Sequence, residues 1–297
     1  YVSQLQGYKI LSFSEFFPLI IFHLSKLIES NVFFFSSFVI IQFFLLKKII
    51  SNSIYGNIVL ISFVLFPLFF LDSLSTIRQH TAILISLMIL YQKDNVNKII
   101  TLAVASMFHY SALSAILFIV IPKLNLKRKF LIIMGILSII VNQIISSTFL
   151  YDFVLFFDLF YDNRIGYILE NSLDHGSRMS LLLLMISILN ILFYKKLINN
   201  SKFNSDLLAL FSIGIFILNL LSFNSTISLR LSLQFIITLM LIIPLYYRMV
   251  ESRVFILALL IFLYFYQINA FSEAYFSGIN DINPYIPYST WIFKWYE

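Results

Sequence analysis

The chain consists largely of long apolar runs that are separated by short polar or charged turns. An α-helix needs about 20 apolar residues to cross a bilayer, and nine runs approach or reach that length. They are 32–46, 55–71, 74–91, 99–121, 130–150, 180–194, 206–222, 230–247 and 254–271. The apolar residues do not alternate with a period of two, so a barrel is excluded and the predicted fold is all-α.

The two ends of the chain differ from these runs. Within residues 1–30, the stretch 16–28 is apolar on one side but carries His23 and Lys26. It predicts an amphipathic helix lying in the membrane interface, with a full span as the alternative. At the other end, residues 273–297 finish in an aromatic, proline-bearing tail that is expected to lie on the membrane surface. Residues 1–297 are predicted to form a single transmembrane domain.

The composition supports a polytopic membrane protein. Of 297 residues, 60% are hydrophobic and 11% are charged, and the mean hydropathy is +0.94. Soluble domains carry about 25% charged residues, so a soluble globular protein is excluded. There is no cysteine, which excludes disulfides and thiol chemistry. The net charge of +6 does not indicate a nucleic-acid partner, because the basic residues are scattered at helix ends.

The run 99–121 decides how the basic residues divide between the two sides of the membrane. If this run crosses once, they divide almost evenly. If it enters and turns back at His109, thirteen lie on one side: Lys47, Lys48, Lys93, Lys98, Lys123, Lys127, Arg128, Lys129, Lys195, Lys196, Lys202, Arg248 and Arg253. Lys and Arg collect on the cytoplasmic side, so the re-entrant broken helix is favoured. Such a break is tolerated only where protein or a wet cavity covers the backbone.

With Lys9, Lys26 and Lys294 left aside, the basic residues on the outer side are all arginines: Arg78, Arg164, Arg178 and Arg230. Their position opposes the positive-inside tendency, so it requires a separate reason. The planar guanidinium matches phosphate and carboxylate groups. The long outer loop, residues 151–179, carries two of these arginines and is expected to be functional because of its length.

Motifs for nucleotides and metals are missing from the sequence. It contains no GxxxxGK[ST], GxGxxG, HExxH or DxD motif, and its four histidines are far apart. We therefore expect no cofactor and no bound metal. Ionisable groups at membrane depth are costly and usually functional, which draws attention to Arg78, Gln79 and His109.

Several of these residues form a pattern that resembles the EpsG/Wzy family of bacterial polysaccharide polymerases. The pattern comprises Ile77-Arg78-Gln79 with Ala82, a short basic turn, and Phe108-His109-Tyr110-Ser111-Ala112-Leu113. The segment 164–167, the pair Leu229-Arg230 and the tail 283–285 are also similar. The resemblance covers roughly residue 7 to the end. It implies a GT-C-like bundle with an outward cavity, and an earlier span with an acidic outer loop upstream of the first residue.

The resemblance implies a polymerase that joins undecaprenyl-diphosphate-linked oligosaccharide repeat units into O-antigen or capsule chains. The reaction would occur at the periplasmic face of the inner membrane, with 151–179 as a periplasmic loop and a chain-length regulator as a possible partner. Arg78 and His109 would be catalytic. The residues expected to bind substrate are Gln79, Ser111, Arg164, Tyr167, Arg178 and Arg230.

Alternatives remain open at this point. Arg78 could anchor the helix start to lipid headgroups, and His109 could make a structural hydrogen bond. Arg164 and Arg178 could form salt bridges within the loop. An O-antigen ligase or another lipid-diphosphate glycosyltransferase would share the outer arginines. A flippase or transporter is disfavoured because the later spans are almost purely apolar at their centres.

Overall fold

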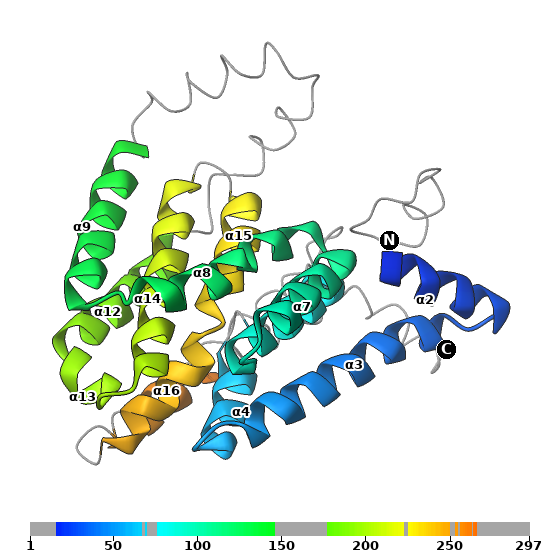
Figure 1. Ribbon diagram of the computed structural model, residues 1–297, viewed down its shortest axis with the longest axis horizontal. Helices are drawn as coiled ribbons and strands as arrows, with labels where there is room; N and C mark the ends of the chain where they lie inside the picture. Colours follow the sequence, from blue (N-terminus) through cyan, green and yellow to red (C-terminus); the bar gives the residue numbers. More distant parts are fainter. Residues whose placement is uncertain are drawn as a thin grey trace, which may run out of the picture. The chain divides into compact units, whose positions relative to one another are not determined.

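The computed structural model describes residues 16–66, 69, 76–145, 177–222, 225–249, 253–254, 256–262 and 264–265. All regular secondary structure in these residues is helical, which confirms the all-α prediction. The chain divides into two compact units: a first unit of residues 1–110 and 243–297, and a second unit of residues 111–242. Figure 1 shows the helices along the chain.

The first unit is built on a pair of helices that pack on each other, one of which, α6 (Ile77–Leu87), also packs against α3 (Asn31–Ser51). Helix α6 continues as the 3-10 helix η2 (Met88–Tyr91); the other member of the pair is α7 (Asn95–Phe108). The turn between them is short because Asp94 caps α7 by accepting a hydrogen bond from the backbone N–H of Asn97 at 3.3 Å. The pair is therefore an antiparallel hairpin. The short helices α2 (Phe16–Leu27) and α4 (Gly56–Leu65) also pack on α3.

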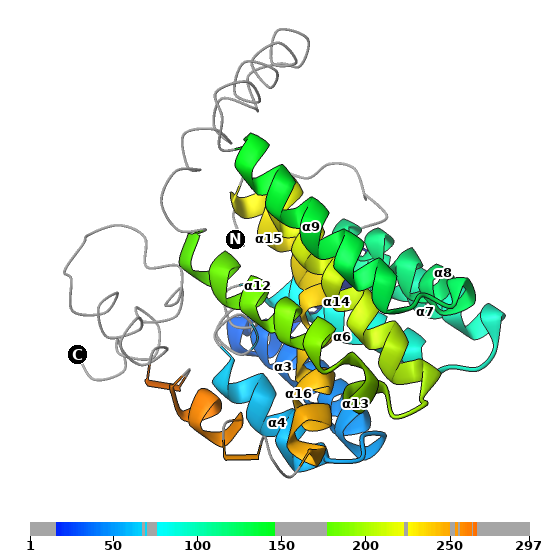
Figure 2. The same ribbon diagram turned by 90° about the vertical axis from the view of Figure 1, so that its left-hand side faces the viewer.

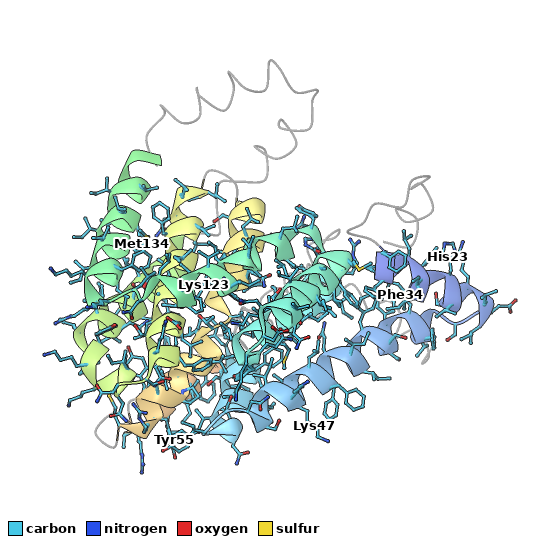
Figure 3. All side chains as sticks on the ribbon, in the orientation of Figure 1. His23, Phe34, Lys47, Tyr55, Lys123 and Met134 are labelled. Carbon is cyan, nitrogen blue, oxygen red and sulfur yellow. The ribbon has the colours of Figure 1, made fainter. Side chains whose placement is uncertain are left out.

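Aromatic rings join α2, α3 and α7 in the first unit. Phe17 of α2 stacks on Phe108 at the end of α7, with 5.0 Å between ring centroids, and Phe38 of α3 meets Phe108 edge-on at 6.1 Å. Phe34, labelled in Figure 3, bridges Phe22 and Phe38. Such pairs add to the burial of apolar surface. They fix α2, a helix where the sequence predicts one, against the end of α7.

The second unit is organised around α14 (Lys202–Leu220), most of which is buried. Its neighbours are α8 (Leu117–Leu124), α9 (Arg128–Ile145), α12 (Ser177–Leu192), α13 (Tyr194–Ile198) and α15 (Ser225–Ile236). Figure 2 shows α9, α12, α14 and α15 side by side. Asn219 donates to Ser138 at 2.6 Å, which links α14 to α9 inside the unit. Polar links of this kind are typical of helix packing within membranes.

Three helical stretches in the described residues are long and apolar enough to cross a membrane: Val32–Ser51, Lys202–Leu220 and Ser228–Arg248. The last contains a turn at residues 237 and 238, between α15 and α16 (Leu239–Arg248). Six further helices are apolar but shorter, including Ile77–Tyr91 and Asn95–Phe108. This collection of apolar helices is that of a polytopic membrane protein.

Candidate functional site

Arg78, Gln79 and His109 lie at the same end of the α6–α7 hairpin. Arg78 and Gln79 are in the first turn of α6, and His109 directly follows the last residue of α7. Because the two helices are antiparallel, of nearly equal length and joined by a three-residue turn, the start of one lies beside the end of the other. The hairpin therefore brings Arg78 and Gln79 to the same end as His109, which is about 30 positions later in the sequence.

Thr76 is the residue at the N-cap position of α6. The Thr76 side chain does not cap the helix; its Oγ1 lies 3.2 Å from His80 Nδ1. His80 is completely buried, Gln79 is 3% exposed and Arg78 is partly exposed. Helix N-termini favour anions through the macrodipole, and Arg78 adds a full positive charge there. The local chemistry of this end suits a phosphate or another anion.

Gln42 of α3 fixes the first turn of α6 and was not singled out by the sequence analysis. Its Nε2 donates to the Ile77 carbonyl at 3.0 Å and to Thr81 Oγ1 at 3.1 Å. Thr81 Oγ1 in turn donates to the same carbonyl at 2.8 Å. The signal in the sequence is an amide side chain within the apolar run 32–46.

His109 marks the point at which α7 ends. Its backbone is extended (φ −161°, ψ 132°), and a 3-10 helix, η3 (Tyr110–Ile116), follows directly. The His109 ring is 7% exposed and stacks on the Tyr110 ring at 4.6 Å. The interruption of the helix at His109 agrees with the sequence analysis. Ser111, also predicted to bind substrate, lies in η3 and is 2% exposed.

Arg178 and Arg230 lie towards one end of the second unit. Arg178 is in the first turn of α12 and Arg230 is an exposed residue in α15. Ser228 Oγ donates to the Leu218 carbonyl at 2.6 Å, so the start of α15 is held beside the end of α14. The side chain of Arg178, together with Arg164, Tyr167 and the loop 151–176, lies outside the described residues.

The opposite end of the second unit carries the lysines. Ser205 Oγ, in the first turn of α14, donates to the Leu126 carbonyl at 3.0 Å, and Arg128 Nε donates to the Ile191 carbonyl at 3.0 Å. These bonds place the start of α14, the start of α9 and the end of α12 at one level. The basic residues at this level are Lys123, Lys127, Arg128, Lys129, Lys195, Lys196 and Lys202. We call this the lysine end of the second unit.

The first unit has the same polarity. Lys47 and Lys48 stand in the last turns of α3, and Lys93 and Lys98 stand at the turn of the hairpin, whereas Arg78 is at the other end of α6. Ser53 Oγ and Tyr91 OH lie 3.4 Å apart, which places the end of α3 beside that turn. Each unit, taken by itself, thus separates its described lysines from the outer arginines, except for Lys26, which lies at the end of α2 just before α3 begins.

The described residues contain no group of three or more His, Cys, Asp or Glu side chains arranged to hold a metal ion. The described ionisable and amide groups at this end of the hairpin include Arg78, Gln79, His80, His109 and the amide of Gln42. Arginine can stabilise developing negative charge, and histidine can accept or hold a proton. This set is suited to the transfer of a group from a phosphate ester.

The fold and this constellation define a polytopic helical membrane protein with a cluster of Arg, Gln and His at one end of a helical hairpin. The chain belongs to the EpsG family, whose family model matches residues 2–290. That family includes Wzy-like polymerases, and the chain is a polysaccharide polymerase-like membrane protein. No curated protein and no solved structure matches the chain significantly.

Proposed function

We propose that this protein is the polymerase that joins undecaprenyl-diphosphate-linked oligosaccharide repeat units into a bacterial surface polysaccharide, either O-antigen or capsule. The observation that carries the proposal is the α6–α7 hairpin, which puts Arg78 and Gln79 at the same end as His109. Family membership gives the reaction class. The reaction takes place at the periplasmic face of the inner membrane.

The proposed reaction is a transfer of a sugar chain from one lipid diphosphate to another lipid-linked unit. A hydroxyl of the acceptor sugar attacks the anomeric carbon of the growing chain, and the bond from that carbon to the diphosphate oxygen breaks. Undecaprenyl diphosphate leaves with the bonding electron pair. Arg78, at the positive end of α6, stabilises the charge of this leaving group. His109 takes the proton of the attacking hydroxyl.

The remaining predicted residues bind substrate in this proposal. Gln79 and Ser111 hydrogen-bond the sugar, the Tyr167 ring stacks on it, and Arg164, Arg178 and Arg230 bind phosphate or sugar oxygens. The loop 151–179 faces the periplasm. The polarity of both units supports this orientation, because lysines mark the cytoplasmic side.

We further propose that α7 and the segment after His109 form a re-entrant broken helix in a GT-C-like bundle. The helix break at His109 supports this proposal. The helix α2 would lie in the membrane interface, and residues 273–297 would lie along the membrane surface. A chain-length regulator would be a protein partner, and no resident cofactor would be needed.

The proposal is tested by deleting the gene from the source bacterium and analysing its surface polysaccharide as a ladder on a gel. The native chain should restore the ladder, whereas Arg78→Ala and His109→Ala should leave acceptors that carry a single repeat unit. Loss of one charge-stabilising donor commonly lowers turnover by about 10²–10³-fold, which is enough to abolish long chains. Immunoblots of membranes must show equal amounts of each variant.

The matched controls are Arg248→Ala, an arginine on the predicted cytoplasmic side, and His23→Ala, an exposed histidine of α2 that is labelled in Figure 3. Both should retain the ladder. If the native chain restores no ladder, or if the variants lose even the single-unit band, the defect is in ligation or export. Either result would refute the polymerase assignment.

A further inference from the structure

A groove of about 600 Å³ runs between α3 and the α6–α7 hairpin, entirely within the first unit. Its apolar wall consists of Ile41, Leu45, Ile85, Met88, Val104 and Phe108. The lining residues of α3 recur at positions 41, 45, 48 and 52, which is one face of a helix. The stretch from 41 to 52 is about 16 Å long at 1.5 Å per residue. That is about half the thickness of the hydrocarbon core, the depth of one leaflet.

The groove is polar at one end only. That end is lined by Lys48 of α3 and its C-cap residue Asn52, by Tyr91 and Gln92 at the end of η2, and by Thr101 of α7. Two further lysines, Lys93 and Lys98, and the carboxylate of Asp94 stand at the adjoining turn of the hairpin. The polar end therefore carries a net positive charge. An occupant with an apolar tail and an anionic head would match both parts of the groove.

The amide of Gln92 gives a second indication of a ligand. One end of the amide, Nε2, lies 2.6 Å from Thr101 Oγ1. The other, Oε1, is buried and has no hydrogen-bond partner among the described residues. A buried polar atom without a partner is costly, so a rotation of the Gln92 amide that brings Oε1 to a hydroxyl bound in the groove is favoured. Gln92 lines the polar end of the groove, next to Lys48 and Asn52.

We propose that this groove is a binding site for one phospholipid, phosphatidylglycerol. The lipid belongs to the leaflet next to Lys48 and the turn of the hairpin. One acyl chain lies along the apolar wall, the phosphate meets Lys48, and a glycerol hydroxyl of the head completes the hydrogen bonding of Gln92. Phosphatidylglycerol fits because its head carries both a negative charge and hydroxyl groups. The basic residues at this end also match the general attraction of lysines to anionic lipid surfaces. This proposal does not depend on the polymerase activity.

The polar end of the groove lies away from the proposed chemistry, while the apolar wall reaches Phe108, the residue before His109. The polar end is at the turn of the hairpin, whereas Arg78 and His109 are at its other end. The groove would therefore hold a resident lipid that supports the hairpin, while the lipid diphosphate of the substrate binds elsewhere. The undecaprenyl chain of the substrate is the competing occupant, and the experiment below separates the two.

The test is to place the purified full chain in nanodiscs made of equal amounts of phosphatidylcholine and phosphatidylglycerol. Native mass spectrometry then identifies the lipids that stay bound. The native chain should retain phosphatidylglycerol in preference to phosphatidylcholine. Lys48→Gln should reduce that preference about five-fold, the effect expected for one lysine near an anionic head. Lys47→Gln is the matched control: it removes the same charge from the adjacent position of α3, which does not line the groove.

A second variant addresses the apolar wall. Val104→Phe narrows the groove and should lower the number of retained lipids, while its unfolding temperature in nanodiscs of phosphatidylcholine alone should match that of the native chain. Equal retention of both lipids by the native chain would overturn the proposal. So would equal effects of Lys48→Gln and Lys47→Gln, which would indicate a diffuse surface charge. Displacement of phosphatidylglycerol by added undecaprenyl phosphate would also overturn it and assign the groove to the substrate carrier.

Discussion

Gln42 of α3 is a polar side chain that positions a proposed functional group, Arg78, in a different helix, α6. Its amide bonds the Ile77 carbonyl and the Thr81 hydroxyl, and the residue after Ile77 is Arg78. Since these bonds cross from α3 to α6, they fix the direction in which α6 begins. The position of the proposed catalytic arginine therefore depends on an amide that touches neither substrate nor reacting atoms.

We expect Gln42→Leu to destabilise the protein by about 0.6–1.7 kcal/mol, the range measured for hydrogen bonds between helices in membranes. Leucine keeps most of the volume of glutamine but loses both bonds. Thr81 still donates to the Ile77 carbonyl, so α6 itself should remain intact. Reversible unfolding in detergent measures the free energy.

Ser37→Ala is the control for this substitution, because Ser37 Oγ donates to the Phe33 carbonyl of its own helix. It should change the free energy of unfolding by less than Gln42→Leu. If the two variants were equally stable, the link between α3 and α6 would contribute nothing to the fold.

At the scale of whole helices, two glycines provide a matched comparison within the second unit. A Cβ on Gly214 of α14 would lie 2.8 Å from Phe235 Cβ and 3.1 Å from the backbone nitrogen of Ile236, both in α15. A Cβ on Gly135 of α9 would meet only Ile191 Cδ1, at 3.5 Å. Small residues let helix backbones approach closely in membranes, and of these two positions Gly214 is the one whose helix contact requires a glycine.

We expect Gly214→Ala to cost about 1–3 kcal/mol, the usual range for an overpacked core. Gly135→Ala should leave the stability unchanged or raise it by up to about 1 kcal/mol, because alanine favours the helix. Thermal unfolding of both variants in the same detergent provides the measurement. Equal destabilisation would show that helix packing at Gly214 is no tighter than at Gly135.

The sequence predicted helices where apolar runs are long. It predicted only some of the points at which these helices are interrupted. The break at His109 followed from the distribution of lysines, a long-range property of the chain. The turn at residues 237 and 238 was not predicted, because the run 230–247 has no glycine and its proline, Pro244, lies inside α16. The turn coincides with a bond from Thr238 Oγ1 to the Phe235 carbonyl at 2.6 Å. Such bonds bend helices, but sequence alone does not show which threonine makes one.

The residues of the candidate site were predictable from the sequence only in part. Arg78, Gln79 and His109 were singled out because charged and polar groups are conspicuous in apolar runs, and their functional roles stay predictions. Their position at one end of the α6–α7 hairpin comes from the structure. Gln42 and the burial of His80 depend on how α3 packs on α6, which local sequence does not determine. Arg164 and Tyr167 stay predictions, since they lie outside the described residues.

For the molecule as a whole, the separation of lysines from arginines in each unit makes the membrane topology testable. The chain has no cysteine, so single cysteines can be introduced and labelled without background. Lys93→Cys and Lys127→Cys flank α7, η3 and α8. If this segment enters the membrane and returns, both cysteines face the cytoplasm. An impermeant maleimide should then label neither in intact spheroplasts and both after permeabilisation.

Lys47→Cys is the control, because the two predicted spans between it and Lys93 place both on one side. Labelling of Lys127→Cys alone in intact spheroplasts would show that residues 99–121 cross once. The lysines would then be divided between the two sides, and the argument that sets Arg78 and His109 in the periplasm would fail with the re-entrant helix.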